Sequence, residues 1–404
     1  MKIAFLTMHS CPLAQAGTKD TGGMNVYAID TARELEAKNH TVDIFTRSHA
    51  NHEAKIINIS PQVRLIHVKA GENDLNKESL AQHIDEYVSG IDEFRSSNNL
   101  RYDIIHSHYW LSGKAGLSLS RKLSIPHVTS FHTTAALKNS TPINNLEIQE
   151  REPSEREIAQ KSDRIIAWTH EESESLVSMY GASKKNISVV PIGVDLQLFK
   201  KKNRETARNR FGLPADKDLI LYLGRLDPIK GPDLFINTVL KLSSRKNLEA
   251  WIVGGEKYTY EKQLLQTQSS ALTLDEKIRF FEPIPHQQLP WLYSAADILI
   301  VPSYYESFSM VTAESLATGT PVIASDVAGP ASLIENGKSG FLIKPGNATE
   351  FASKINYLLD SNKTLENMSA YAPSTVSHLA WPRIIEKIIN TYEIAINSPE
   401  RISL

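Results

Sequence analysis

The sequence predicts an α/β protein with two Rossmann-like domains that face each other. Short β-branched runs alternate with longer amphipathic segments along almost the whole chain, and this alternation is typical of parallel sheets that helices cover on both faces. The alternation is interrupted once, by a polar and charged stretch from residue 193 to residue 217, and then begins again. A length of 404 residues also suits two domains better than one core.

The first half is predicted to form one sheet over residues 1–195. Its opening strand, KIAFLTM, is followed by a segment in which Val26, Ile29, Ala32 and Leu35 recur at helical spacing. The further elements expected here are the strands TVDIFTR and VRLIHV, the helix SLAQHIDEYVSGIDEF, and the strands YDIIHSHY, HVTSFHTT, RIIAWT and ISVVPIGV.

The second half is predicted to form another sheet over residues 196–380. Its elements begin with the segments LILYLGRL, GPDLFINTVLKLSS, LEAWIVGG, KIRFFEPI, DILIVPS and PVIASD. The basic cluster at 200–210 shows no amphipathic stripe, so we expect it to be a solvated face of the linker. A last helix, PRIIEKIINTYEIAI, lies within residues 381–404 and is expected to pack back toward the first domain.

The composition excludes several classes of protein. Lysine and arginine number 44 against 46 acidic residues, without the basic excess of a dedicated nucleic-acid binder. The single cysteine, Cys11, cannot form an internal disulfide, which suits a reducing compartment. No apolar run reaches the roughly 18 residues that a membrane span needs. We therefore expect a cytoplasmic protein with no membrane span and no nucleic-acid partner.

Two loops suggest a site for phosphate groups. In TKDTGGMNVY, Gly22 and Gly23 open the first long helix, where backbone N–H groups can approach an anion. The dinucleotide fingerprint and the Walker pattern are both absent there, and a tight turn explains such a pair equally well. In GRLDPIKG, Arg225 and Lys230 follow the first strand of the second half and could neutralise a diphosphate, although either could be a surface cation.

Two glutamates stand eight positions apart in PSYYESFSMVTAESLATGTPVIASD. Glu306 is expected in the loop after a buried strand and Glu314 in the second turn of the next helix, so both can face one cleft. They could accept hydrogen bonds from two parts of a ligand, or act as the acid and base of a glycosidase. Glutamates near a helix start are also favoured by the helix dipole alone. The cationic loops nearby favour the first interpretation.

Four histidines lie at or near the carboxyl ends of strands in the first half, namely His9, His106, His108 and His132. Because His106 and His108 are two residues apart on one strand, we expect that they do not both point the same way at the rim. The H-x-H pattern also invites a zinc site, but no cysteine partner or H-E-x-x-H motif accompanies it. No metal ligand is therefore assigned.

Six segments together carry a resemblance to a known family: TGGMNVY, HSHYW, SFHTT, VVPIGVDLQLF, GRLDPIKGPD and ESFSMVTAESLATGTPVIAS. In this order, they resemble the retaining nucleotide-sugar glycosyltransferases of family 4, which have the GT-B fold, and the resemblance covers nearly the whole chain. Within that family the first half is most similar to the enzymes of mycothiol synthesis that transfer N-acetylglucosamine to 1D-myo-inositol 3-phosphate. Sucrose-phosphate synthases are similar but more distant.

The resemblance implies roles for the residues that bind the sugar donor. Glu306 would bind hydroxyls of the donor sugar and Glu314 those of the ribose, while Arg225, Lys230 and the Gly23 backbone would neutralise the departing diphosphate. The catalytic residues implied are Arg225, Lys230, Glu306 and His132. The further donor-binding positions implied are Gln15, Ala16, Ile284, Ser309, Met310 and Val311. Family members commonly have glycine where Ser309 stands, so its side chain is expected to tighten the donor pocket.

The resemblance also implies a phosphorylated acceptor. Phosphate contacts would come from Lys77, Tyr109, Thr133 and Arg151. Polyol contacts would come from His9, Asp20, Thr21, Gly22, Gly23, Met24 and Asn25. The donor would be a UDP-sugar, no cofactor is required, and magnesium would be an optional aid; a homodimer is expected by analogy.

Three alternatives remain open. A sucrose-phosphate synthase-like enzyme would join UDP-glucose to fructose 6-phosphate. A nucleotide-sugar epimerase on the same fold would need no acceptor, and a non-catalytic protein would bind the donor without turnover.

Overall fold

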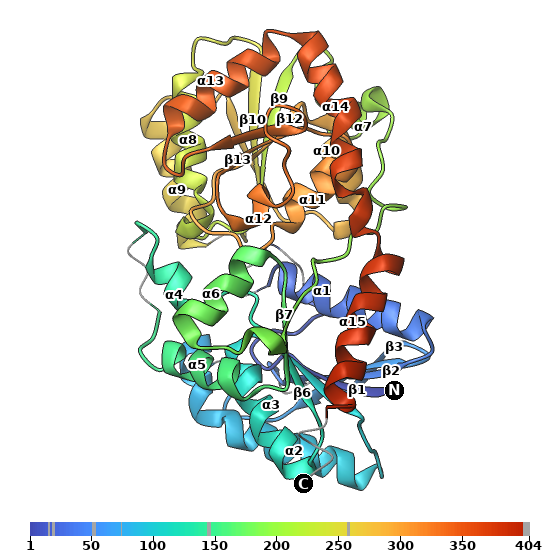
Figure 1. Cartoon of the computed structure of the whole chain (residues 1–404). Helices are drawn as coiled ribbons and strands as arrows, with labels where there is room; N and C mark the ends of the chain where they lie inside the picture. Colours follow the sequence, from blue (N-terminus) through green and yellow to red (C-terminus); the bar gives the residue numbers. More distant parts are fainter. Residues whose placement is uncertain are drawn as a thin grey trace.

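This computed structural model describes residues 1–14, 17, 21–50, 54–73, 75–143, 147–256 and 259–398. Over these residues the chain forms two sheets in separate units, which lie one above the other in Figure 1. Helices cover both faces of each sheet. The predicted α/β fold with two Rossmann-like units is confirmed.

The lower unit in Figure 1 contains the first sheet, whose strand order is β3-β4-β2-β1-β5-β6-β7-β8. All neighbouring strands are parallel except β3 and β4. The strands are β1 (Lys2–Leu6), β2 (Thr41–Arg47), β3 (Ile56–Ser60), β4 (Val63–Val68), β5 (Ile104–His108), β6 (His127–Ser130), β7 (Arg164–Ala167) and β8 (Ile187–Val189). The helices are α1 (Gly23–Ala37), η1 (Lys77–His83), α2 (Ile84–Ser97), α3 (Trp110–Leu123), α4 (Ala135–Asn139), α5 (Arg151–Lys161), α6 (His170–Tyr180) and η2 (Lys184–Asn186).

The second sheet is wholly parallel in the order β11-β10-β9-β12-β13-β14. Its strands are β9 (Asp218–Leu223), β10 (Leu248–Val253), β11 (Ile278–Phe281), β12 (Ile298–Val301), β13 (Val322–Ser325) and β14 (Gly340–Ile343). The helices of this half are α7 (Arg204–Arg210), η3 (Pro228–Lys230), α8 (Pro232–Lys241), α9 (Tyr260–Ala271), η4 (His286–Gln288), α10 (Leu289–Ala295), α11 (Met310–Ala317), α12 (Ala328–Ala331), α13 (Ala348–Leu359), α14 (Asn362–Val376) and η5 (Ser377–Leu379).

The last described helix, α15 (Trp381–Ile396), runs from the second unit down along the first (Figure 1). It contacts α1 and β7, and the Tyr392 hydroxyl lies 2.7 Å from Nδ1 of His106 on β5. The backbone N–H of Val194 donates to the Leu379 carbonyl at 2.8 Å, so two crossings of the chain between the units lie side by side. One apolar cluster continues through this region and joins the inner helices of both units.

Each sheet has its central strand where the strand order reverses. β1 lies between β2 and β5, and β9 lies between β10 and β12. In parallel sheets, ligands bind beyond the carboxyl ends of the strands at such a reversal. The loops that follow these strands are therefore the places to look for a site.

Candidate functional site

A cavity of about 300 Å³ lies between the two units and is lined by residues from both. From the first unit, the loops after β1, β5 and β6 contribute His9, Tyr109 and His132. From the second unit, the segments after β9 and β12 contribute charged groups, among them Lys230 and Glu306. The cavity thus lies where the strand order predicts a ligand.

The glycine pair at the start of α1 lies against the second unit. A Cβ atom on Gly23 would lie 3.2 Å from the Met310 sulfur, closer than side chains normally approach. Asn25 holds the preceding loop, because its Nδ2 donates to Ser10 Oγ at 2.8 Å and to the Cys11 carbonyl at 2.7 Å. The glycine therefore permits a close approach of the two units beside the cavity.

On the second unit, Lys230 and Glu306 form an ion pair at the cavity wall. Lys230 Nζ lies 2.8 Å from Glu306 Oε1, and the Ser303 hydroxyl donates to the same oxygen at 3.0 Å. Arg225, which also lines the cavity, lies 3.6 Å from the Asp227 carboxylate. Two cations and two carboxylates thus line the cavity beyond the carboxyl ends of β9 and β12.

Glu314 on α11 is held by two partners. Its Oε1 lies 2.8 Å from His286 Nε2, and its Oε2 accepts a hydrogen bond from the Tyr293 hydroxyl at 2.8 Å. Burial opposes the charge on His286, but Glu314 outweighs it and raises the pKa of the imidazole. These two contacts fix the direction of the Glu314 carboxylate at the cavity wall. Glu306, eight positions earlier in the chain, has different partners.

The histidines of the first unit form a buried group. Nδ1 of His108 lies 3.1 Å from Nε2 of His132, and burial lowers the pKa of both, that of His108 to about 3. The expected difference in direction between His106 and His108 is wrong: their rings are 4.3 Å apart because alternate strand residues share a face. Burial also lowers the pKa of His9, so these imidazoles are neutral at ordinary pH.

The backbone is strained at three places on the cavity wall. Tyr109, His132 and Ser309 have φ angles of 76°, 63° and 74°, in the left-handed region that favours glycine. Such strain gathers at functional sites, where surrounding structure maintains it. Glycine adopts such a φ without strain, so the backbone at Ser309 would suit the glycine that the resemblance implies at this position. The Ser307 hydroxyl donates to the His132 carbonyl at 2.6 Å and so links the two units here.

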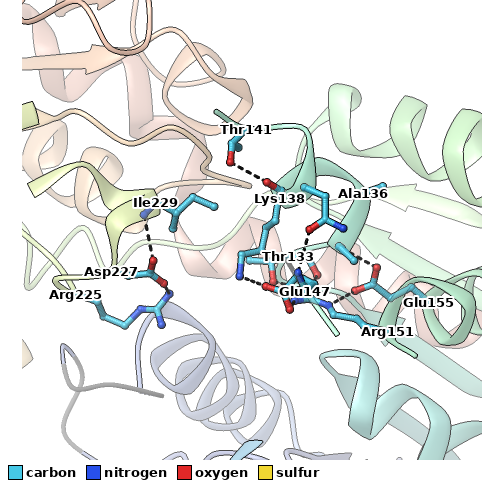
Figure 2. Close-up of polar contacts among 12 residues, drawn as sticks. Thr133, Ala136, Lys138, Thr141, Glu147, Arg151, Glu155, Arg225, Asp227 and Ile229 are labelled. Atoms are coloured by element: carbon cyan, nitrogen blue, oxygen red, sulfur yellow. Dashed lines mark hydrogen bonds and ion pairs between the residues drawn. The ribbon is translucent and has the colours of Figure 1, made fainter. Parts of the chain in front are cut away.

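The predicted phosphate-binding side chains lie around Tyr109. Lys77 Nζ is 5.7 Å from the Tyr109 ring centroid, and the Arg151 guanidinium is 4.7 Å from it on α5. Arg151 Nη2 donates to the Thr133 carbonyl at 2.7 Å and to its hydroxyl at 2.9 Å (Figure 2). Lys77, Tyr109 and Thr133 line the cavity, whereas Arg151 is buried behind them.

The structure brings most of the predicted residues together. Those that line the cavity are His9, Gly22, Gly23, Met24, Asn25, Lys77, Tyr109, His132, Thr133, Arg225, Lys230, Ile284, Glu306, Ser309, Met310, Val311 and Glu314. Thr21 lines an adjoining cavity that shares His9 and Lys77 with the first. The predictions for Gln15, Ala16 and Asp20 concern positions outside the described residues.

Sequence reasoning missed several residues of this wall. They include Lys138, Trp168, His286, Ser303 and Tyr305. Trp168 and Ser303 lie directly beyond β7 and β12, and His286 comes five residues after β11, so the strand-end rule could have found them. Lys138 lies on α4, beyond the reach of that rule.

The described residues contain neither a candidate metal centre nor a helix able to cross a membrane. Among those residues, no group of three or more His, Cys, Asp or Glu side chains could hold a metal ion. Of the helices described, none combines the length and the apolar character needed to cross a membrane.

Comparison with known sequences shows a match along the chain. Residues 21–198 match the family model described as Glycosyltransferase Family 4, and residues 203–375 match the one described as Glycosyl transferases group 1. The D-inositol 3-phosphate glycosyltransferase of Nocardiopsis dassonvillei is 34% identical, over 100% of this chain and 96% of that protein.

Comparison with solved structures shows the same architecture. Sucrose-phosphate synthase from Thermosynechococcus elongatus superposes with a TM-score of 0.91 and 27% identity, over 97% of this chain and 98% of that one. Anabaena HepE, solved with UDP and glucose, has a TM-score of 0.79 and 21% identity, over 97% and 99% of the chains. The predicted GT-B fold is thereby confirmed.

Proposed function

This chain belongs to glycosyltransferase family 4, and on that premise we propose that it transfers a hexose or N-acetylhexosamine from a UDP-sugar to a phosphorylated polyol or sugar. The first-choice pair is UDP-N-acetylglucosamine and 1D-myo-inositol 3-phosphate. The names of relatives that match at 34% and 35% identity, D-inositol 3-phosphate glycosyltransferase, support this choice.

One observation carries the proposal: a single cavity has two separate sets of cations on its opposite walls. Arg225 and Lys230 come from the second unit, and Lys77 and Lys138 from the first. A diphosphate and a phosphate monoester would each find cations, and the sugar between them would lie near His132. A hydrolase that uses water in place of a charged acceptor has no need for the second set.

The second unit can stabilise the departing diphosphate. Negative charge develops on that group as the glycosidic bond breaks, so cations already in position act mainly in the transition state. Arg225, Lys230 and the amino end of α11 supply positive charge in this proposal. Glu306 and Glu314 would hold sugar and ribose hydroxyls as hydrogen-bond acceptors.

We further propose that the anomeric configuration is retained without a protein nucleophile. The two candidate carboxylates are both occupied, Glu306 by Lys230 and Glu314 by His286 and Tyr293. Nε2 of His132 already has a partner in Nδ1 of His108 at 3.1 Å, so we assign this neutral imidazole a hydrogen bond to the donor sugar and not a covalent role. The leaving phosphate would take the acceptor's proton, and no resident cofactor is needed.

A sucrose-phosphate synthase-like activity is the second candidate. The TM-score of 0.91 to such an enzyme over 97% of this chain favours it. Both candidates share a phosphorylated acceptor, so the walls of the cavity do not separate them.

A mass-spectrometric assay tests the proposal. Purified protein is incubated with UDP-N-acetylglucosamine or UDP-glucose, each paired with 1D-myo-inositol 3-phosphate, fructose 6-phosphate or no acceptor. A glycosylated inositol phosphate is expected, with and without a chelator such as EDTA. Product from fructose 6-phosphate alone would favour the second candidate. Donor conversion without an acceptor would indicate an epimerase or simple hydrolysis and would contradict the proposal.

A further inference from the structure

A glutamate lies between two cations at the acceptor end of the cavity. We propose that the Glu147 carboxylate is an internal counter-ion for Lys138 and Arg151 that the phosphate of the acceptor replaces. Glu147 would then select for acceptors with a doubly charged group. This inference rests on the proposed function for the identity of the acceptor, but not for the binding of phosphate.

The three side chains form a connected ion group (Figure 2). Glu147 Oε2 lies 2.6 Å from Arg151 Nη1, and Glu147 Oε1 pairs with Lys138 Nζ. The Glu147 and Lys138 side chains are each 12% exposed, and that of Arg151 is 1% exposed. Charges this well buried need a counter-ion, and here Glu147 serves both cations, while Glu155 is a second carboxylate partner of Arg151.

Arg151 is fixed in place independently of Glu147. Its Nε donates to Glu155 Oε1 at 2.7 Å, and its Nη2 is bound twice by Thr133. Glu155 is itself held by the Ala135 backbone N–H and the Tyr180 hydroxyl, at 2.8 and 2.7 Å. The guanidinium would therefore keep its position if Glu147 moved away.

Nη1 is the end of Arg151 that would become available to another anion if Glu147 moved away. It is buried and has no well-aligned hydrogen bond, although Glu147 lies at ion-pair distance. The contact between Nη1 and Glu147 is therefore mainly a charge interaction, and it is not the bidentate hydrogen-bonded pair that arginine commonly forms with carboxylates. A tetrahedral phosphate between Nη1 and Lys138 Nζ could accept from both.

Glu147 is in a better position to move than its partners. It lies outside helices and strands, in the connection between α4 and α5, and its own N–H donates to the Asn139 side chain at 3.1 Å. Lys138 lines the cavity next to Lys77 and Thr133, so the cation pair can be reached from the acceptor side. Release of the carboxylate would leave Lys138 Nζ and Arg151 Nη1 free to contact a ligand that enters there.

The exchange would favour a phosphate monoester over other groups. Burial opposes the charge on Glu147, yet Arg151 and Lys138 outweigh it and hold the pKa of that carboxyl at about 2. A displacing group must therefore compete with a full negative charge. A phosphate monoester carries close to two charges near pH 7, whereas a hydroxyl carries none. Polyols without phosphate would leave Glu147 in place.

The test measures the binding of inorganic phosphate to the full chain by calorimetry, at constant ionic strength and without donor or acceptor. E147Q keeps the shape of the side chain and removes its charge, and we expect it to bind phosphate about tenfold more tightly. K138Q removes a cation and should bind about tenfold more weakly. The control E152Q changes an exposed glutamate on the first turn of α5 and should match the native chain.

Opposite changes in two variants cannot both arise from damaged folding. The proposal is overturned if E147Q binds phosphate no more tightly than the native chain, or if K138Q leaves the affinity unchanged. In the same preparations, the KM for 1D-myo-inositol 3-phosphate should fall about tenfold in E147Q. Tighter phosphate binding in a chain that glycosylates no phosphorylated acceptor would support the exchange and contradict the proposed function. Normal glycosylation of the acceptor, together with an unchanged affinity of E147Q for phosphate, would support the proposed function and contradict the exchange.

Discussion

The two walls of the cavity differ in how the chain builds them. On the second unit, Arg225, Lys230 and Glu306 follow two adjacent strands, and two of these side chains already contact each other. On the first unit, Lys77 comes from η1 and Arg151 from α5, with other elements between them in the chain. The donor wall is thus a local product of strand ends, whereas the acceptor wall depends on the packing of distant segments.

This comparison predicts that loss of one charge on the donor wall has the largest effect. Lys230→Ala should lower kcat by about 10²- to 10³-fold, because the positive charge of Lys230 stabilises the negative charge that develops on the leaving diphosphate. Steady-state kinetics at saturating acceptor would measure this effect. Lys241 is exposed at the end of α8, so Lys241→Ala is the matched control and should leave kcat unchanged.

The outcome also separates two roles of Lys230. If kcat holds and only the KM for the donor rises, then Lys230 binds the ground state and the transition state equally well. The donor wall would then contribute to substrate binding alone, and the two walls would not differ in how they act on catalysis.

The acceptor wall should respond with a smaller change of another kind. Lys77→Ala is expected to raise the KM for the phosphorylated acceptor by about tenfold while kcat stays within about twofold, because other cations lie at the same end of the cavity. The exposed Lys69→Ala serves as the control. Unchanged acceptor kinetics in Lys77→Ala would show that the phosphate binds elsewhere.

The same contrast explains how much the sequence could predict. Glu306 and Glu314 were placed on their loop and helix correctly, because strand ends and helix starts leave local signals. Lys77 and Arg151 were found only by resemblance, since neither belongs to a local pattern that points to a ligand. Glu147 and Lys138 were missed altogether, because they stand nine positions apart and only the tertiary fold brings them together.

The fold shows a similar division between local and non-local information. The alternation of strands and helices identified both sheets, but not the edge strands β3 and β14. In β3 two residues are exposed and three are partly buried, and only Ile57 and Ile59 pack against the apolar cluster. β14 has four residues and begins at Gly340. Edge strands with so little apolar signal are specified by their neighbours in the sheet, which a single segment does not reveal.

A third prediction concerns the preset direction of Glu314 on the donor wall. Since Glu314 raises the pKa of His286, the pair stabilises the fold fully below the ordinary histidine pKa and loses this effect as the pH rises through the raised value. His286→Gln should therefore cost about 1 kcal/mol near pH 5.5 and less near pH 9. Urea unfolding at a series of pH values would measure the difference.

Tyr293→Phe provides the comparison for that experiment. It removes the other hydrogen bond to Glu314, and burial keeps the pKa of the Tyr293 hydroxyl well above the range studied. Its cost should not change with pH over that range. A pH-independent cost for His286→Gln as well would show that the imidazole is held as a neutral hydrogen-bond partner. Asp30 and Asp195 also favour the charged form of His286, so they should stay intact in both variants.

The smallest effect is expected at Ser309, where the donor wall carries backbone strain. A left-handed residue other than glycine costs about 1 kcal/mol or more, and Ser309→Gly would relieve that cost. The variant would also lose the 2.8 Å hydrogen bond between the Ser309 and Thr312 hydroxyls and gain freedom when unfolded. These terms nearly cancel, so the free energy of unfolding should change by less than about 0.5 kcal/mol.

Ser309→Ala loses the same bond but keeps the strain, so the alanine variant should be less stable than the glycine variant by about 1 kcal/mol in urea unfolding. At the exposed Ser332, where φ is −75°, alanine should instead be the more stable of the two. The same order at both positions would mean that the left-handed backbone of Ser309 relaxes easily, and the donor wall would be less rigid than its preformed contacts suggest.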